Sequence, residues 1–482
     1  MNLIEIKVKS ILFLILFFGI SGLAKSSQAA TIQAASCSYA DVSAVVAAAS
    51  SGDTVLVPPG SCVWSGFLII NKPIMLQGAG AGLTNITGSV GHDASYTIFL
   101  ITYEPADPIS ASDMLFRLTG FTFDANNDSR ILYIHNKNTT ATLPLKQIRI
   151  DHNSFLNTLN VNLFFVGLIY GVADNNTFDG ASTFEFVGNQ ENTWNNQTFR
   201  YGPGDLFYIE DNIFTMTGTT VGSGDGWKGY VTRYNTFTYT PTSSMLSPWF
   251  DTHGNSNYGG HNALYGVMRA EIYGNVVTAI DPISGVKGIT QRGSKMLAFF
   301  NKTLNFYPGL SSLEIWGEFP DSANPSTNTV PFKVNDSYYW NNRADNTLLS
   351  PGLTIDSCTG LGCGGGICTQ NNDSCPSLSA NVNWWTQAAS FDGSYGVGCG
   401  SLAIRPASCS MGVGYWATNQ SCVSVDSASV GAHPAQPISG TLYKCTASNT
   451  WTAYYTPYIY PHPLRGGADT TPPAAPSGLT VN

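Results

Sequence analysis

In the middle of the chain, a strand-like pattern that ends in Asn recurs at fairly regular intervals. Each copy is a short alternating segment followed by Asn and then by more apolar residues, as in IRIDHNSF and FYIEDNIF. The repeated residues are Asn126, Asn153, Asn176, Asn212, Asn235, Asn275, Asn301 and Asn341. Their shortest intervals are about 23 to 27 residues, and the longer ones fit the same unit with an insertion. This period predicts a solenoid.

The solenoid that suits this pattern is a parallel β-helix. Strands of one coil would pair with the equivalent strands of the next coil ~4.8 Å away, so that equivalent residues stack in columns. Asn suits the turn because it tolerates the left-handed backbone region and because its amide can bond to its neighbours. An antiparallel sandwich would show two-residue hairpin turns, and a propeller would show a ~40-residue blade motif. Neither is evident, so we expect an all-β fold.

The ends of the chain differ from the repeat. Residues 1–30 read as a secretory signal, with basic residues, an apolar run and small residues before a cleavage point. That run is shorter than the ~18 residues a membrane span needs, so we expect no membrane span and a secreted or cell-surface, extracellular protein. An Ala- and Val-rich stretch at 39–49 predicts one short helix. With a net charge of −9 and no basic block, a nucleic-acid partner is not expected.

Beyond residue 345 the repeat gives way to a Cys-rich extension. The expected organisation is a signal at 1–30, a β-helix at 31–345, an extension at 346–465, and a Pro-rich linker at 466–482. The linker leads into a possible first strand of a fibronectin type III module. We expect the extension to pack on or cap the last coils, since an open solenoid end needs covering. We also expect a monomer.

The chain contains ten Cys, an even number that implies disulfides in an exported protein. Cys37 and Cys62 stand alone near the N-terminus and are expected to pair with each other. The other eight lie between Cys358 and Cys445, and their pairing is left open. Zinc binding is disfavoured, because no pair shows Cys-x2-Cys spacing and no His lies among them.

Three stretches resemble a known family. CSYADV, GDTVLVPPGSCVW and INKPIMLQGAG are similar to the N-terminal cap and first coils of right-handed parallel β-helix proteins of the pectate-lyase-like superfamily. The likeness extends to about residue 345. IRIDHNSF resembles a strand of pectate lyases, and VKGITQRGSKMLAFFN resembles the segment where a catalytic basic residue precedes Gln-Arg-Gly. The resemblance implies a right-handed β-helix with an N-terminal capping helix. It also implies a polysaccharide partner, cleaved by β-elimination.

On this resemblance, Lys287 takes the place of the catalytic basic residue and Arg292 that of the substrate-binding arginine. The family usually has Arg where this chain has Lys287. One coil that the family has between the Asp and Arg segments is also missing here.

Glycines that follow charged segments give a first register for the coils. They are Gly188, Gly229, Gly254, Gly293 and Gly317. One position earlier stand Val187, Lys228, His253, Arg292 and Trp316. Three positions earlier stand Glu185, Gly226, Asp251, Thr290 and Glu314. These two positions share a face of a strand. The register therefore predicts Lys228, His253 and Arg292 on successive coils, flanked by Asp251 and Glu314.

The predicted face suits the cleavage of a uronate polymer. β-Elimination needs a base beside the sugar carboxylate and cations that neutralise it. His253 is a second candidate base, and Asp251 could orient it or hold a cation. Candidate substrate-binding residues are Lys228, Arg269, Glu271, Trp249 and Trp316, the last two because exposed aromatic rings stack on sugars.

Three further hypotheses about function stay open. If Asp251 and Glu314 lie two coils apart, their backbones are ~9.6 Å apart, which suits the ~6.5 to 9.5 Å carboxyl spacing of inverting glycoside hydrolases. A non-catalytic polysaccharide-binding adhesin or structural β-solenoid is also compatible with the C-terminal linker. Finally, Asp151, Asp174 and Glu210 precede three of the repeated Asn residues by two positions. They are candidates for binding Ca²⁺, and otherwise they form a solvated outer face.

Overall fold

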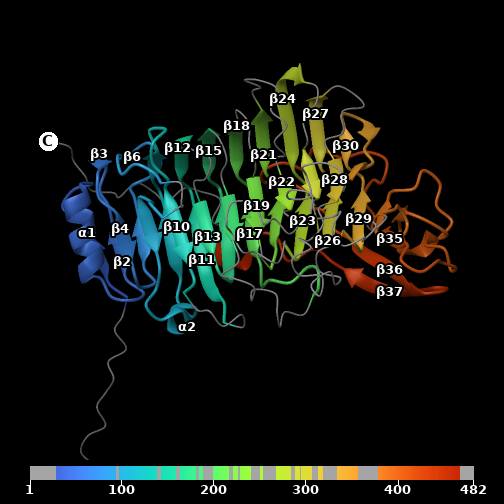
Figure 1. The fold of residues 1–482 in the computed structure, drawn as a ribbon, viewed down its shortest axis with the longest axis horizontal. Coiled ribbons are helices and arrows are strands. Elements are labelled where there is room, and N and C mark those ends of the chain that lie inside the picture. The colour runs from blue at the N-terminus through green and yellow to red at the C-terminus, as the bar shows by residue number, and fades with distance from the viewer. Residues whose placement is uncertain are drawn as a thin grey trace, which may run out of the picture.

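The chain folds into a long stack of coils built from three sheets, whose strands pair in parallel from one coil to the next (Figure 1). The computed structural model describes residues 29–93, 97–137, 143–158, 163–180, 184–187, 199–216, 221–225, 228–239, 250–252, 267–283, 288–291, 293, 295–306, 313–317, 334–355 and 378–466. Each coil passes through the three sheets in the same order, which we name C, A and B. The parallel β-helix predicted from the Asn repeat is therefore confirmed.

Sheet A has 12 strands, which pair in parallel from the first coil to the last. They are β1 (Thr31–Gln33), β2 (Thr54–Leu56), β5 (Met75–Gln77), β8 (Phe116–Thr119), β11 (Leu145–Asp151), β14 (Ile169–Asp174), β17 (Phe207–Glu210), β20 (Tyr230–Arg233), β23 (Arg269–Tyr273), β26 (Lys295–Phe299), β29 (Ser337–Trp340) and β33 (Trp384–Thr386).

Sheet C has 10 strands and precedes sheet A in each coil. They are β4 (Leu68–Ile70), β7 (Ile101–Tyr103), β10 (Leu132–His135), β13 (Leu163–Val166), β16 (Phe184–Val187), β19 (Val221–Asp225), β22 (Phe250–Thr252), β25 (Ile289–Gln291), β28 (Leu313–Gly317) and β32 (Gly352–Ile355). Because β32 and β33 still belong to the sheets, the coils continue past residue 345, where the sequence pattern stops.

Sheet B has 11 strands and closes each coil. They are β3 (Gly60–Trp64), β6 (Thr84–Gly88), β9 (Thr122–Asp124), β12 (Ser154–Thr158), β15 (Thr177–Gly180), β18 (Ile213–Met216), β21 (Thr236–Tyr239), β24 (Val276–Ile283), β27 (Lys302–Phe306), β30 (Arg343–Ala344) and β31 (Thr347–Leu348). Inward-facing side chains stack from coil to coil. The rings of Phe155, Phe178, Phe214 and Phe237 follow one another with centroids 4.9, 4.8 and 4.5 Å apart. Stacked rings of this kind fill the core between the sheets.

Helix α1 (Tyr39–Ala48) covers the N-terminal end of the stack (Figure 1). The helix begins where the Ser38 hydroxyl accepts a hydrogen bond from the backbone N–H of Asp41, as an N-cap residue does. Its Val42 and Val46 are buried in the core. The predicted disulfide between Cys37 and Cys62 is present and ties this cap to β3. A second, four-residue helix, α2, spans Pro108–Ala111.

A ladder of Asn side chains runs along the turn between sheets A and B. Its members are Asn153, Asn176, Asn212, Asn235, Asn275, Asn301 and Asn342. Each side-chain N–H group donates to the amide oxygen of the next Asn, for example from Asn212 to Asn235 at 3.0 Å. The same amide also donates to backbone carbonyls, so buried polar groups are satisfied coil after coil.

The ladder corrects two residues of the predicted series. Asn126 lies in an exposed turn, and Phe121 takes the ladder position, where its backbone N–H donates to Asn153. At the other end the member is Asn342, while Asn341 adopts φ 48°. The left-handed residue is thus the one before the ladder Asn, as at Tyr234 with φ 56°. The repeated Asn is therefore needed for the hydrogen bonds of its side-chain amide, and not because it can adopt the left-handed backbone conformation.

The extension packs on the outward face of sheet A. It forms a sheet D of β34 (Val397–Gly400), β35 (Gly414–Ala417), β36 (Thr441–Ala447) and β37 (Thr450–Tyr455), which lies at the far end from α1 (Figure 1). Trp416 on β35 is fully buried, and its ring centroid lies 5.1 Å from that of Trp340 on β29. Short 3₁₀ turns occur at Leu402–Ile404 and Pro463–Arg465. The extension therefore shares a second hydrophobic core with the coils.

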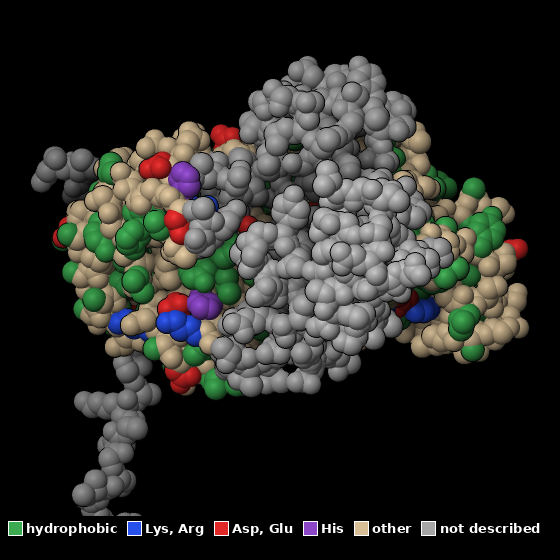
Figure 2. Space-filling view, viewed as in Figure 1, with side chains coloured by type: hydrophobic (Ala, Val, Ile, Leu, Met, Phe, Trp, Pro, Cys, Tyr) green, Lys and Arg blue, Asp and Glu red, His purple; other side chains and the backbone are tan. Residues whose placement is uncertain are grey.

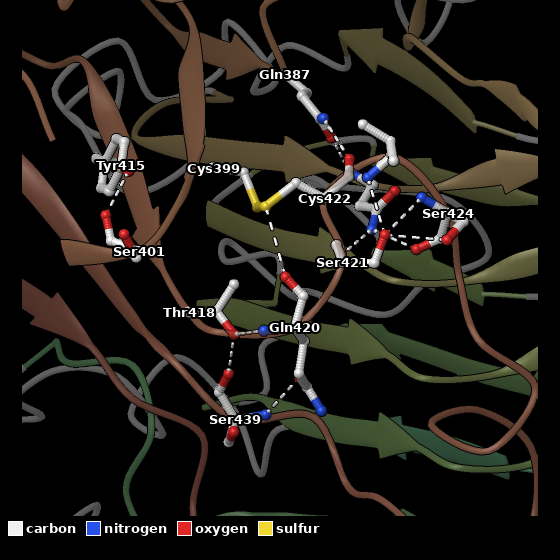
Figure 3. Close-up of a disulfide and its surroundings, with 12 residues drawn as sticks. Gln387, Cys399, Ser401, Tyr415, Thr418, Gln420, Ser421, Cys422, Ser424 and Ser439 are labelled. Carbon is white, nitrogen blue, oxygen red and sulfur yellow. Dashed lines mark hydrogen bonds between the residues drawn. A yellow bond between two sulfur atoms is a disulfide. The ribbon is translucent and has the colours of Figure 1, made fainter. Parts of the chain in front are cut away.

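Among its described residues, two disulfides hold the extension together. Cys399 pairs with Cys422, and Cys409 pairs with Cys445. Beside the first of them, the Gln387 amide N–H donates to the Cys422 carbonyl at 3.0 Å (Figure 3), and its oxygen accepts from the backbone N–H of Asn341. Gln387 thus fixes the disulfide loop to the end of the Asn ladder. The remaining cysteines, Cys358, Cys363, Cys368 and Cys375, lie outside the described residues.

The last described residues, 454–466, form a segment that we call the strap. The strap runs back over the outward face of sheet A, from a contact of Tyr454 with Asp336 beside β29 to a contact of Arg465 with Arg149 on β11. Midway, the Arg233 guanidinium donates to the backbone carbonyls of Tyr458 and Ile459 at 2.7 and 2.8 Å. Sheet A is therefore covered along many coils.

None of the helices in the described residues has the length and hydropathy that a membrane-spanning helix needs. The predicted signal lies outside the described residues, apart from its last two positions, and so does the linker from 467 onwards.

Candidate active site

The predicted carboxylate row lies on sheet C. Strand β22 pairs with β25, and β25 pairs with β28, so Asp251 lies beside Thr290, and Thr290 beside Glu314. The flanking positions Phe250 and Ile289 are buried in the core. Because side chains alternate along a strand, Asp251 and Thr290 face the outward side of sheet C, and Glu314 occupies the same position of the register on β28. The predicted two-coil spacing of Asp251 and Glu314 is confirmed.

The same row continues toward the N-terminus. Glu185 on β16 lies in register with Ser223 on β19, while the core residue Phe184 pairs with Val221. One residue of β19, Gly222, is therefore extra, and the ladder shifts there. Gly226, which the glycine register placed in this row, lies outside the described residues. We call the outward row of Glu185, Asp251, Thr290 and Glu314 the carboxylate column.

Polar groups support the carboxylate column from inside the coil. The Tyr230 hydroxyl donates to the backbone carbonyl of Asp251 at 2.9 Å. The inward-facing Gln291 donates to Ser337 at 2.9 Å and accepts from the Tyr339 hydroxyl. These hydrogen bonds hold β22 and β25 in place at the positions from which the side chains of Asp251 and Thr290 project outward. The sequence showed Gln291 within a motif but could not show that its side chain faces inward.

The Asp251 side chain is only 4% exposed, and that of Thr290 1%. Within the described part of the chain, the Thr290 hydroxyl has no hydrogen-bond partner. A buried polar atom that lacks a partner is uncommon and often marks a site that a ligand or water completes. The column is thus a sheltered polar row rather than a fully wetted surface.

Several candidates lie where their side chains are not described. His253, Lys287, Arg292 and Trp249 are outside the described residues. For Glu314 and Trp316 the structure describes the backbone of β28 and not the side chains. The predicted basic residues therefore stay predictions.

Lys228 is not on sheet C, which corrects the glycine register. It lies between β19 and β20, at the corner where the chain enters sheet A. Its ammonium group donates to Asp205 at 2.5 Å and to the Tyr170 hydroxyl at 2.8 Å, and the residue is 3% exposed. Burial lowers the pKa of Lys228, although Asp205 opposes this. Lys228 is an internal ion-pair partner and does not face the carboxylate column.

Arg269 and Glu271 are buried on the outward face of sheet A, where they contact residues 200–205. Both are 0% exposed. The Arg269 guanidinium donates to the backbone carbonyl of Arg200, and Glu271 accepts from the backbone N–H of Gly202 at 2.7 Å. Burial lowers the pKa of Arg269 and raises that of Glu271. Neither residue can contact a polymer bound on sheet C, so their predicted substrate-binding role is not supported.

The calcium candidates form the predicted column, but its members are already paired. Asp151, Asp174 and Glu210 are successive neighbours on sheet A, followed by Arg233. Their carboxylates are bound by Arg117 at 2.5 Å, by Arg149 at 3.0 Å and by Arg233 at 2.6 Å, respectively. The pKa of Asp151 lies below its usual range, because hydrogen bonds from Arg117 and His152 outweigh the effect of burial.

The acidic column is therefore a buried charge network beneath the strap. Its oxygens face guanidinium groups, whereas calcium sites gather six to eight oxygens around the ion. Among the described residues, no group of three or more His, Cys, Asp or Glu side chains is arranged to hold a metal ion. We place no ion here.

No known protein-family model matches this chain, and no curated protein sequence matches it significantly.

Proposed function

We propose that this chain cleaves an acidic polysaccharide on the outward face of sheet C. The observation that supports this most is the carboxylate column, in which Asp251 and Glu314 share one row with Thr290 between them. Parallel sheets bring such residues together at a fixed spacing, although they are far apart in sequence. The resemblance to the pectate-lyase-like superfamily supports a polysaccharide as the substrate.

The described geometry favours hydrolysis with inversion. Two strand spacings put the backbones of Asp251 and Glu314 ~9.6 Å apart, and the side chains can adjust this toward the ~6.5 to 9.5 Å that an inverting pair needs. One carboxyl group would protonate the glycosidic oxygen, while the other would activate a water molecule on the opposite face of the sugar. Thr290 is small enough to leave room between them, and its hydroxyl can hold the water or the sugar.

β-Elimination, which the resemblance implies, is the second candidate. Strand β25 lies beside β22, with Ile289 paired to Phe250, and it belongs to the segment that resembles the family's catalytic segment. The base and the neutralising cations would then come from His253, Lys287 and Arg292. Lys228 and Arg269 are not available for that role, because both are buried with other partners.

We further propose that the protein acts outside the cell as a monomer. The three described disulfides suit an oxidising compartment. The basic and apolar N-terminal residues provide the expected export signal.

A product analysis separates the functional classes. The full chain would be incubated with polygalacturonate, alginate and an uncharged glucan, with and without a chelator, and new reducing ends would be counted. Hydrolysis releases saturated ends with inverted anomeric configuration, whereas elimination adds the ultraviolet absorbance of an unsaturated uronate. Binding without new ends would favour the adhesin. If neither uronate polymer is bound or cleaved, the proposal is wrong.

A further inference from the structure

A cluster of three aromatic rings lies on the outward face of sheet C near the N-terminal end. The ring centroids form a triangle, with Phe99 and Tyr133 5.2 Å apart, Tyr133 and Phe164 5.7 Å apart, and Phe99 and Phe164 5.9 Å apart. The planes of these pairs are tilted by only about 20°. Phe99 and Phe164 are buried, whereas Tyr133 is partly exposed. We call Phe99, Tyr133 and Phe164 the aromatic platform.

A charged group borders the aromatic platform. One oxygen of the Glu104 carboxylate lies 2.6 Å from Nδ1 of His135. The other oxygen forms an ion pair with the ammonium group of Lys137. His135 is two residues after Tyr133, so both project from the same side of β10. The Lys137 side chain is 57% exposed, and its ammonium group keeps donors for another anion.

The molecular surface agrees with these contacts. Figure 2 shows hydrophobic side chains over the N-terminal coils, with charged side chains and a His beside them. Burial and then the charge of Glu104 raise the pKa of Tyr133 to about 12, so the hydroxyl stays protonated and can donate.

Two members of the aromatic platform, Tyr133 and Phe164, belong to the same outward row as the carboxylate column. Tyr133 pairs with Phe164, and Phe164 with Glu185, which is the first member of the column. From β13 to β22 the sheet advances by three strands, so Phe164 lies ~14 Å along the helix axis from Asp251. A polymer that follows this row from Asp251 passes over Tyr133.

We infer that the aromatic platform is a binding subsite for a uronate residue of the polysaccharide chain. The Tyr133 ring would stack on the sugar face, and the Tyr133 hydroxyl would donate to the sugar. The Lys137 ammonium group would pair with the sugar carboxylate, while Glu104 positions both Lys137 and His135. This inference rests on the proposed function, since it takes the same polymer and extends its path toward the N-terminal coils.

Binding can be measured apart from cleavage in an Asp251→Asn background. Isothermal titration with polygalacturonate and alginate would compare this parent with Tyr133→Ala and Lys137→Gln on top of it. Tyr395→Ala, at an exposed Tyr of the extension, is the matched control. We expect Tyr133→Ala to weaken binding roughly three- to tenfold, the range for a lost ring contact. Lys137→Gln should weaken binding and reduce its salt dependence, while Tyr395→Ala should leave it unchanged.

The outcomes distinguish the subsite from the proposed function. If Tyr133→Ala and Lys137→Gln both bind the uronate polymers as tightly as the parent does, the subsite is wrong, even when the wild-type protein cleaves the polymer. Persistent cleavage by Asp251→Asn overturns the catalytic column but not the subsite. If no uronate polymer binds at all, both ideas fail. Thermal unfolding checks that Tyr133→Ala folds, and should it not fold, the exposed Lys137→Gln decides.

Discussion

Arg465 and Glu210 are 255 positions apart in the sequence, yet Nη1 of Arg465 lies 3.0 Å from Oε1 of Glu210. The same guanidinium group contacts Asp211 and lies 3.3 Å from Asp174. The strap therefore ends by placing one cation among three carboxylates of the coils. Its docking depends on charge as well as on apolar contact.

Replacing Arg465 should loosen the strap. In Arg465→Met, the buried Glu210 and Asp174 lose a cation, and we expect the free energy of unfolding to fall by about 3 to 5 kcal/mol, as when a buried pair loses one partner. Urea unfolding measures this. Lys146→Met, at an exposed Lys of β11, is the control and should change stability by less than ~0.5 kcal/mol. Equal losses in the two variants would show that the strap contributes little.

The strap should also make the fold sensitive to acid through His462. Burial lowers the pKa of His462 to about 4, from an ordinary 6.5. The unfolded chain therefore binds more protons between these values, so the stability contribution is complete above pH 6.5 and is lost as pH falls to 4. The loss is about 3 kcal/mol at ~1.4 kcal/mol per pKa unit.

His462→Gln tests this pH dependence. The charged groups that face His462 are Glu210, Arg149, Arg233 and Arg465, and of these only Glu210 titrates in the acid range. The pKa of Glu210 is lowered, so its own contribution is lost only below about pH 4.5. Unfolding in urea from pH 7 to 4.5 should therefore show a flatter curve for the variant. Parallel curves for variant and wild type would contradict the role of His462.

An interior ladder Asn should be hard to replace. The Asn212 amide donates to Ala173, Glu210 and Asn235 and accepts from Asn176. Asn212→Ala leaves several of these buried groups without a partner, at ~1 to 3 kcal/mol each, so we expect a loss of roughly 3 kcal/mol or more. Asn126→Gly, in the exposed turn with φ 54°, should be nearly neutral. Thermal unfolding measures both variants, and only Asn212→Ala, at a ladder position, should lower the melting temperature clearly.

Lys228 offers a test of structure against function. Because Lys228 is paired with Asp205 inside the corner, Lys228→Met should lower the free energy of unfolding by about 2 kcal/mol. The affinity of the folded protein for polygalacturonate should not change. A weaker affinity with unchanged stability would instead return Lys228 to the substrate-binding residues.

The period of the coils could be predicted because its cause is local and repeated. Every ladder Asn solves the same turn with the same amide, so the pattern is visible in sequence. The errors occur where the pattern is ambiguous. SYYWNN offers two adjacent Asn residues, and only the structure shows that Asn341 takes the left-handed position while Asn342 joins the ladder.

The register of sheet C was predicted in part for a physical reason. Asp251, Thr290 and Glu314 align because their strands pair without interruption. At β19 an extra residue shifts the pairing, and a shift of one residue reverses which face a side chain occupies. Glu185 lies three positions before Gly188, whereas its partner Ser223 lies six positions before Gly229, so a count back from Gly229 misplaced Lys228.

The burial of Arg269 and Glu271 could not be foreseen at all. Both were expected to be near a bound sugar, and both face outward from sheet A. Residues 200–205, which come from an earlier coil, contact both side chains, and Tyr455 of the extension interacts with Glu271; no local pattern in β23 predicts this. The alternation of a strand predicts which face a side chain occupies. It does not predict which distant segment of the chain packs over that face.

The carboxylate column is tested most directly by the cleavage rates of Asp251→Asn and Glu314→Gln, with Asp113→Asn at an exposed site as the control. Each column variant keeps the shape of its side chain but cannot donate or accept the proton, so kcat should fall by about 10² to 10⁴. The column variants should unfold at the same temperature as the wild-type protein, and Asp113→Asn should keep the wild-type kcat. Wild-type cleavage rates in both column variants would contradict the account.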